Sequence, residues 1–345
     1  MANVKREFGV IGLGRMGGNL ARAAIEKGMK VVGYTQEGAP ADLVKSGLVE
    51  IKDEKDFKKH LTGPRAIFLY IPAGPAVDTV IDELSSNLEA GDIIVDGGNS
   101  YWGDSIRRAK RLKEKKIQFI DVGTSGGVSG ARHGACFMVG GDRSAVSRIE
   151  PMLLELAVEG GYVHAGPAGS GHYTKLVHNG IEFGMLQAIG EGVDLLEHYR
   201  DDLDIPQVLE CWRHGSVIRS WLIDLMTDAY NTENGLSKIP AYVEDTGEVN
   251  WLVDDALHME VSIPVIAQAV MKLIDSRDEK KNWARAIAMM RHGFGGHPYG
   301  ANQGIVEERR TGRIGYYVSP EEERGPKEVK SAKRTEKGPK FKKAG

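Results

Sequence analysis

The chain has 345 residues and a formal net charge of −3, and hydrophobic residues make up 41% of it. This composition excludes a protein that is disordered throughout, and the length is typical of two or three domains. The near-neutral charge gives no reason to expect nucleic acid or an anionic membrane as a partner. No apolar run approaches the ~20 residues of a membrane span.

The cysteines and the N-terminus indicate the compartment. Cys136 and Cys211 lie far apart in apolar surroundings, so we expect two buried thiols in a reducing compartment. The N-terminal residues lead directly into an apolar strand, without the apolar region of a signal peptide. Both features predict a cytoplasmic protein.

Strands and helices alternate over the first part of the chain. The expected helices are Asn19–Lys27 and Ala76–Leu88, and the expected strands are Phe8–Ile11, Val31–Tyr34, Ala66–Ile71, Asp92–Asp96, Phe119–Val122 and Phe137–Gly140. Several of these strands are continuous apolar runs, which are typical of strands buried on both faces of a parallel sheet. Residues 1–168 are therefore predicted to form a doubly wound α/β domain.

The pattern becomes helical near Gly166. We expect helices at Gly171–Tyr199, Pro206–Arg213, Ser220–Ala229 and Ile263–Asp275, and hence an all-α domain over residues 169–318. Residues 319–345 are rich in Lys and Arg and poor in apolar side chains, so we predict a disordered tail.

A glycine-rich turn follows the first strand. Gly12-Leu13-Gly14-Arg15-Met16-Gly17 matches G-x-G-x-x-G between a strand and a helix. The first glycine permits the turn, the second admits a pyrophosphate close to the backbone, and the third allows close packing of helix and sheet. The helix N-terminus attracts the anion. This context favours dinucleotide binding over a purely structural turn.

The end of the second strand bears on cofactor choice. It reads Tyr34-Thr35-Gln36-Glu37, where an Asp or Glu would hold the adenine ribose of NAD. Thr35 replaces that acid, and no arginine follows to bind the 2′-phosphate of NADP. We assign Thr35 and Gln36 to the cofactor site and favour NADP slightly over NAD, because the missing acid removes a repulsion against the phosphate.

Other polar or glycine-rich segments follow apolar strands, where ligands bind in open parallel sheets. Ile71, Pro72, Ala73 and Asn99 are assigned to the cofactor site. Asn99 also offers a donor and an acceptor to substrate, unless it only forms an Asx turn. The run Gly123–Arg132 offers backbone amides and a serine hydroxyl to a carboxylate or to hydroxyls, unless it is a plain surface loop.

Four polar residues share one face of the long predicted helix: Lys175, His178, Asn179 and Glu182. At about 100° per residue they fall within roughly a 100° arc. A buried polar face needs a partner or a substrate, and a buried lysine shifts toward its neutral form and can act as a base. The alternative is a solvated face with a Lys–Glu pair.

Glycines on the same helix bear on its burial. Each weakens a helix by about 1 kcal/mol relative to Ala. Glycine is favoured at such positions when the backbone of another segment packs closely against the helix, so we expect a buried helix. The glycines are Gly180, Gly184, Gly190 and Gly192.

Together these motifs resemble the β-hydroxyacid dehydrogenases. Within that superfamily, Lys175-x-x-His178-Asn179-Gly180-x-Glu182 resembles the decarboxylating 6-phosphogluconate dehydrogenases. So do the segments Trp212–Gly215, Ser220–Ile223 and Arg291–His297. The resemblance covers roughly residues 6–300 and points to the shorter form of the family. It implies a Rossmann-like domain, followed by a helical domain that completes the substrate site.

The resemblance implies oxidative decarboxylation of 6-phospho-D-gluconate to D-ribulose 5-phosphate and CO2, with reduction of NAD(P), in the pentose phosphate pathway. Lys175 would be the general base for the C3 hydroxyl, and Glu182 would protonate C1 of the enediol. The sugar acid would be bound by Asn99, Ser125, Gly126, Gly127, His178 and Asn179. Its phosphate would meet Arg277, Arg291 and His297, the last two from a neighbouring subunit of a homodimer or homotetramer.

Two departures from the family pattern weaken phosphate binding. Phe183 stands where a tyrosine is usual, and Asn250 replaces a basic residue before Trp251. A non-decarboxylating dehydrogenase or reductase acting on a small hydroxyacid is therefore the alternative, and a cofactor-sensing protein without turnover is a third. The histidines and cysteines show no spacing typical of metal ligands, so no metal is expected.

Overall fold

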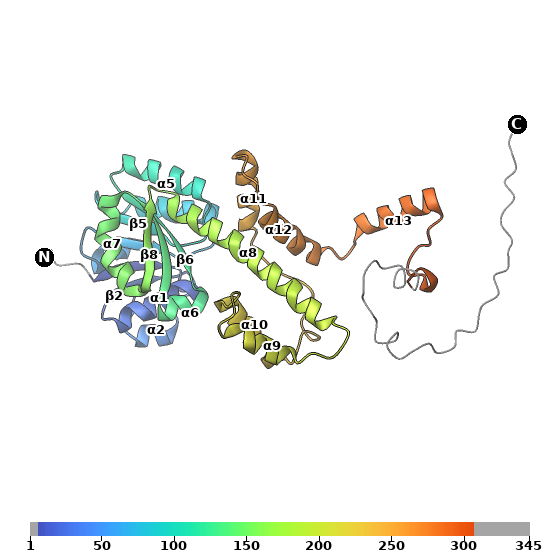
Figure 1. Ribbon diagram of the computed structural model, residues 1–345. Helices are drawn as coiled ribbons and strands as arrows, with labels where there is room; N and C mark the ends of the chain where they lie inside the picture. The colour runs from blue at the N-terminus through green and yellow to red at the C-terminus, as the bar shows by residue number, and fades with distance from the viewer. Residues whose placement is uncertain (1–5, 307–345) are drawn as a thin grey trace, which may run out of the picture. The chain divides into compact units, whose positions relative to one another are not determined.

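The structure, a computed structural model, describes residues 6–306 (Figure 1). These residues form two compact units, the first made of residues 6–187 with 242–275, and the second of residues 188–241 with 276–306. The whole of the predicted tail, 319–345, and the end of the predicted helical domain lie outside the described residues. Within the described part, no helix is long and apolar enough to cross a membrane.

An eight-stranded sheet runs through the first unit, in the order β3-β2-β1-β4-β5-β6-β7-β8. Its strands are β1 (Glu7–Ile11), β2 (Lys30–Tyr34), β3 (Val49–Glu50), β4 (Ala66–Leu69), β5 (Ile93–Asp96), β6 (Gln118–Ser125), β7 (Ala135–Gly141) and β8 (Ala157–Gly166). Neighbouring strands are parallel except β6 and β7. The strand order reverses at β1, and ligands bind at such a switch point in doubly wound sheets.

Two apolar layers flank the sheet. Leu20 of α1 (Arg15–Glu26) and Leu153 of α7 (Arg143–Leu156) are buried in one layer. Ile81 of α4 (Pro75–Ser85) and Leu112 of α5 (Trp102–Glu114) are buried in the other. The shorter helices are α2 (Ala41–Lys45), η1 (Glu54–Asp56), α3 (Phe57–His60) and α6 (Gly127–His133). The predicted doubly wound α/β domain is confirmed, with one antiparallel neighbour that the pattern did not predict.

Between Gly166 and residue 306 the regular elements are all helices: α8 (Ser170–Glu197), α9 (Ile205–Arg213), α10 (Trp221–Glu233), α11 (Glu248–His258), α12 (Pro264–Arg277) and α13 (Asn282–Gly295). In the first unit, Leu176 of α8 packs with Leu252 of α11 and Val270 of α12. In the second, Val193 packs with Leu209 and Tyr230. This confirms the predicted all-helical fold after the sheet.

Candidate active site

The turn between β1 and α1 fits a pyrophosphate. Gly12 has a φ of +90°, and a Cβ on it would lie 2.3 Å from the carbonyl oxygen of Tyr70. A Cβ on Gly17 would lie 2.1 Å from the Gly12 oxygen, so α1 packs directly on the turn. A Cβ on Gly14 would meet nothing within 4 Å. Open space therefore lies beside the N-terminus of α1, where backbone N–H groups favour an anion.

Three side chains of this turn differ in their access to a ligand. Arg15 is exposed and Met16 is half-buried, whereas Leu13 is buried in the core. Only the backbone of Leu13 is available to a cofactor. The Gly12 N–H donates to the Tyr34 oxygen at 3.0 Å, so the glycine turn is tied to the end of β2.

The segment after β2 turns away immediately. The Gly38 N–H donates to the Thr35 oxygen at 3.2 Å. Thr35 is half-buried, and Gln36 and Glu37 are exposed in the turn. Thr35 and Gln36 therefore lie at the same sheet edge as the glycine turn.

The segments after β4 and β5 contact each other. A Cβ on Gly98 would lie 2.9 Å from the Ile71 oxygen. Pro72 and Asn99 are exposed and Ala73 is half-buried, so all three are open to solvent at this edge. The Gly98 N–H donates to Asp96 Oδ1 at 3.1 Å. This Asp96–Gly98 bond has the form of an Asx turn, and it leaves the Asn99 amide uncommitted to the turn.

The glycine run at 123–132 is not a plain surface loop, which was the alternative that the sequence left open. Gly123 to Ser125 continue strand β6, and Gly127–His133 form helix α6. Between them, Gly126 has a φ of +104° and Gly127 one of +59°, backbone values that glycine adopts readily. The Ser125 side chain thus projects from a strand end rather than from a loop.

The polar face of α8 is assembled as the spacing predicts. Lys175 Nζ lies 2.5 Å from Asn179 Oδ1 and 3.4 Å from His178 Nδ1. His178 Nδ1 is 3.8 Å from Glu182 Oε2, and its Nε2 is 3.0 Å from Ser125 Oγ. The structure therefore brings five predicted site residues from two elements into one polar cluster.

Backbone contacts hold α8 against β6. A Cβ on Gly123 would lie 2.4 Å from the Cβ of Lys175, so only glycine lets the lysine approach this strand. The buried Asp121 carboxylate accepts the N–H of Gly169 at 2.7 Å and of His172 at 2.9 Å. These contacts anchor the start of α8 one turn before Lys175. Asp121 was missed because, within an apolar run, it carries no motif.

Burial changes the titration of the cluster. Desolvation lowers the pKa of Lys175, although the carboxylate of Glu182 opposes the change. Desolvation also lowers the pKa of His178, and the nearby Lys175 charge adds to the effect. A lysine with a lowered pKa is more readily neutral and is therefore better suited to accept a proton.

The predicted burial of α8 is only partly right. A Cβ on Gly180 would lie 2.3 Å from Leu252 Cδ2. This glycine is therefore closely packed, but against a side chain and not against the backbone that we expected. Gly190 and Gly192 meet nothing within 4 Å. Ile181 is 54% exposed. The prediction failed because a glycine lowers helix propensity whether or not something packs on it.

The three predicted phosphate ligands belong to the second unit, whereas the α8 cluster belongs to the first. Arg277 ends α12, Arg291 is exposed on α13, and His297 follows that helix. The His297 oxygen accepts from His292 Nδ1 at 2.8 Å. Of the two departures, Phe183 packs in the apolar cluster around Leu176 and Leu252, and Asn250 lies exposed on α11.

Tyr70 was also missed by the sequence analysis. A Cβ on Gly97 would lie 2.7 Å from its ring, and its hydroxyl is 3.2 Å from Thr124 Oγ1. Burial raises the pKa of Tyr70 to about 12, so its phenol stays protonated. Tyr70 therefore contacts the glycine turn, the segment after β5 and the strand of Ser125. A single aromatic residue at the end of an apolar run gives no signal of this role.

Two other expectations can be compared with the structure. Cys136 is half-buried and Cys211 is exposed, so the prediction of two buried thiols was wrong. Cys211 lies on the outer face of the short helix α9, where an apolar neighbourhood in sequence does not mean burial. Within residues 6–306, no group of three or more His, Cys, Asp or Glu residues could hold a metal ion.

Known protein families match the chain along most of its length. Residues 7–166 match the NAD binding domain of 6-phosphogluconate dehydrogenase, and residues 171–292 match the C-terminal domain of 6-phosphogluconate dehydrogenase. The chain belongs to the 6-phosphogluconate dehydrogenase family. The nicotinamide-cofactor domain and the oxidoreductase class follow from this membership.

Individual proteins of this family are similar to the chain over most of its length. The chain is 43% identical to the "Putative 6-phosphogluconate dehydrogenase YqeC" of Bacillus subtilis over 84% of this chain and 98% of that protein. It is 38% identical to an NAD(+)-dependent, decarboxylating 6-phosphogluconate dehydrogenase of Haloferax volcanii, over 84% of this chain and 97% of that protein. The 6-phosphogluconate dehydrogenase of Plasmodium falciparum aligns with a TM-score of 0.71 and 29% identity, over 86% of this chain and 66% of that one.

A solved structure of much lower identity also shares the fold. A 3-hydroxyisobutyrate dehydrogenase of Mycobacterium tuberculosis aligns with a TM-score of 0.61 at 19% identity, over 79% of this chain and 94% of that one. Because the same fold occurs at such low identity, the fold alone does not identify the reaction, and the chemistry has to be argued from side chains.

Proposed function

We propose that this member of the 6-phosphogluconate dehydrogenase family oxidatively decarboxylates 6-phospho-D-gluconate to D-ribulose 5-phosphate and CO2, with reduction of NAD(P). The observation that carries the proposal is the α8 cluster, in which Lys175 and Glu182 are seven residues apart on one face of the helix. Seven residues correspond to a rise of ~10 Å along a helix. A linear substrate beside α8 can therefore meet a different group at each of two carbons.

Lys175 acts first in this proposal. Its neutral amine accepts the proton of the C3 hydroxyl, a role that its lowered pKa supports. Asn179 and His178, both within 3.5 Å of Nζ, orient the amine. A bound nicotinamide supplies the hydride acceptor.

Glu182 acts after oxidation. As CO2 leaves the resulting β-keto acid, Lys175 returns its proton to the carbonyl oxygen, which gives an enediol. Glu182, from the next turns of α8, then donates a proton to C1, while the enediol hydroxyl gives its proton back to the neutral Lys175. Ser125, Gly126 and Gly127 bind the sugar acid together with Asn99.

Phosphate binding is assigned to Arg277, Arg291 and His297. A guanidinium offers two parallel donors to a phosphate, which suits Arg277 and Arg291 to this anion. We propose that Arg291 and His297 serve the site of a neighbouring subunit in a homo-oligomer, and that the enzyme acts in the pentose phosphate pathway of the cytoplasm. NADP remains our prediction for the preferred cofactor, because Thr35 stands where an acid would repel the 2′-phosphate.

A substrate panel tests this function. With each of NAD and NADP, reduced cofactor is followed by absorbance and CO2 release is measured on the same samples. We expect turnover of 6-phosphogluconate with one CO2 for each reduced cofactor, and a higher kcat/KM with NADP. Oxidation of 3-hydroxyisobutyrate with NAD(P), or reduction of tartronate semialdehyde in a parallel assay supplied with NAD(P)H, with no turnover of 6-phosphogluconate, would support the alternative enzyme. Dinucleotide binding with no turnover would support the cofactor-sensing protein.

A further inference from the structure

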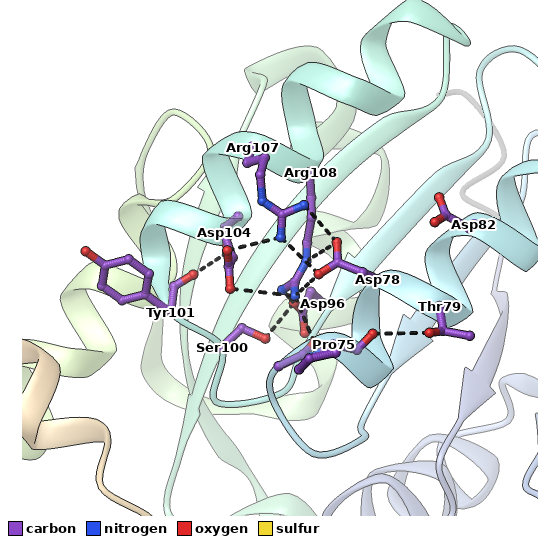
Figure 2. Close-up of polar contacts among 12 residues, drawn as sticks. Pro75, Asp78, Thr79, Asp82, Asp96, Ser100, Tyr101, Asp104, Arg107 and Arg108 are labelled. Carbon is purple, nitrogen blue, oxygen red and sulfur yellow. Dashed lines mark hydrogen bonds and ion pairs between the residues drawn. The ribbon is translucent and has the colours of Figure 1, made fainter.

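A fully buried arginine lies below the sheet edge that carries the cofactor segments. Arg108 of α5 is 0% exposed, and its Nη1 donates to Asp96 Oδ2 at 3.2 Å. Its Nη2 donates to the Gly74 oxygen at 3.1 Å and to Asp78 Oδ2 at 3.0 Å. Figure 2 shows this guanidinium between the carboxylates of Asp78 and Asp96. One side chain therefore joins α4, α5 and the end of β5.

Asp96 transmits this contact to the segment that carries Asn99. The Asp96 carboxylate is 0% exposed and accepts the Ser100 hydroxyl at 2.8 Å, in addition to the Gly98 N–H. Its position therefore determines the fold of residues 97–100. Without Arg108, this buried carboxylate would lose its positive partner, which is strongly unfavourable in a protein interior.

The Gly74 contact transmits the same restraint to the segment after β4. Gly74 has a φ of +108° and precedes the first residue of α4, so its oxygen marks the end of the Ile71–Gly74 segment. That segment also touches Gly98 through the Ile71 oxygen. Arg108 thus holds two segments that lie next to each other at the carboxyl ends of neighbouring strands β4 and β5.

We propose that Arg108 is a positioning residue for the nicotinamide half of the cofactor site. A doubly wound sheet binds a dinucleotide across the switch point, with one mononucleotide over each half. β2 and β3 lie on one side of β1, and β4 and β5 lie on the other. The segments held by Arg108 therefore belong to the half opposite the adenine-ribose position at Thr35. The inference rests on the proposed dehydrogenase function, because it assigns that half to nicotinamide.

The neighbouring Arg107 provides a matched comparison. It is 50% exposed and donates to Asp78 and Asp104, but has no contact with Asp96 or Gly74 in the described structure. Both arginines thus pair with Asp78, and only Arg108 reaches the two segments. A lysine in place of Arg108 keeps the charge, but its single ammonium cannot reproduce the planar fork that serves three acceptors.

The test compares Arg108→Lys with Arg107→Lys in the full chain. Binding of ADP, which reports on the adenine half, and of NADPH and NADH is measured by titration calorimetry at a temperature where both variants are folded. We expect Arg108→Lys to raise the Kd of the reduced dinucleotides about ten-fold, the size of one lost charged hydrogen bond. The Kd of ADP should stay within two-fold, and Arg107→Lys should change neither.

The proposal would be overturned if folded Arg108→Lys bound ADP and the dinucleotides more weakly by the same factor. It would also be overturned if the variant bound both as tightly as the unaltered chain does. If Arg108→Lys fails to fold, Ser100→Ala is the deciding variant, because it removes only the hydroxyl bond to Asp96. It should raise the dinucleotide Kd several-fold and leave the ADP Kd unchanged, and an unchanged dinucleotide Kd rejects the proposal. None of these titrations needs 6-phosphogluconate, so failure of the proposed reaction would be seen separately.

Discussion

Ser125 Oγ lies 3.0 Å from His178 Nε2, although the two residues are 53 positions apart in the chain. The contact joins the end of β6 to the polar face of α8. It also fixes the imidazole so that Nδ1 faces Lys175 and Glu182. The ring therefore links the hydroxyl of the glycine-rich segment to both proposed catalytic groups.

Replacing Ser125 tests this link. Ser125→Ala removes the hydroxyl and leaves the backbone of β6 unchanged, so we expect the KM for 6-phosphogluconate to rise about ten-fold, the size of one charged hydrogen bond. Steady-state kinetics measure this change. The control is Ser129→Ala, at an exposed position on α6, which should not alter KM. An unchanged KM in Ser125→Ala would remove Ser125 from the substrate site.

Lys175 and Glu182 should fail at different steps. Lys175→Met removes the base and should slow the first hydride transfer by roughly 10²–10⁴-fold. Glu182→Gln keeps the shape but cannot donate the proton, so reduced cofactor should form in the first turnover and ribulose 5-phosphate should follow slowly. Stopped-flow absorbance with product quenching separates the two phases. If Glu182→Gln blocks the first hydride transfer as completely as Lys175→Met does, the separate roles are wrong.

The pH profile of hydride transfer should report the lowered pKa of Lys175. Because the neutral amine is the base, the rate should rise with pH and level off above a pKa that lies below the usual 10.5 of lysine. Glu182 raises the pKa of Lys175. Glu182→Gln should therefore move this acid limb to lower pH. First-turnover rates across pH measure the shift, and a limb displaced to higher pH would contradict the assignment.

Glu54 should make stability depend on pH. Burial, and then the charges of Glu83 and Asp53, raises the pKa of Glu54 to about 7. A folded-state pKa above the unfolded value means that its stabilising contribution is complete below about pH 4.5 and is lost as pH rises through 7. Glu54→Gln should thus raise Tm at pH 8 and have little effect at pH 4.

The expected gain at pH 8 is modest because Glu54 is only half-buried. After allowance for solvent screening we expect roughly 1 kcal/mol, or about 2–4 °C in Tm. Thermal unfolding followed by circular dichroism at both pH values measures it. Glu114→Gln makes the same charge change at an exposed position on α5 and should show no such pH-dependent gain. Equal gains in both variants would mean that net charge, rather than Glu54 burial, is responsible.

The alternating fold could be predicted from local patterns. Continuous apolar runs such as Ala66–Leu69 and Ile93–Asp96 are buried on both faces, and this environment leaves a signal in every residue of the strand. The helix face of Lys175, His178 and Asn179 was equally predictable, because residues on one helix face are related by its fixed rotation alone. Helix α5 was missed because two of its three buried residues, Ser105 and Arg108, are polar or charged, and only Leu112 is apolar.

Contacts between distant segments depended on the tertiary structure. In the sequence, Arg107 and Arg108 are adjacent charges of the same type, yet one is half exposed and the other is fully buried against Asp96. Tyr70, Asp121 and Ser125 likewise acquire their partners only when strands and helices pack. Local patterns report the periodicity of an element, whereas burial and pairing depend on which other element covers each position. Which element packs over each position depends in turn on the order of strands in the sheet.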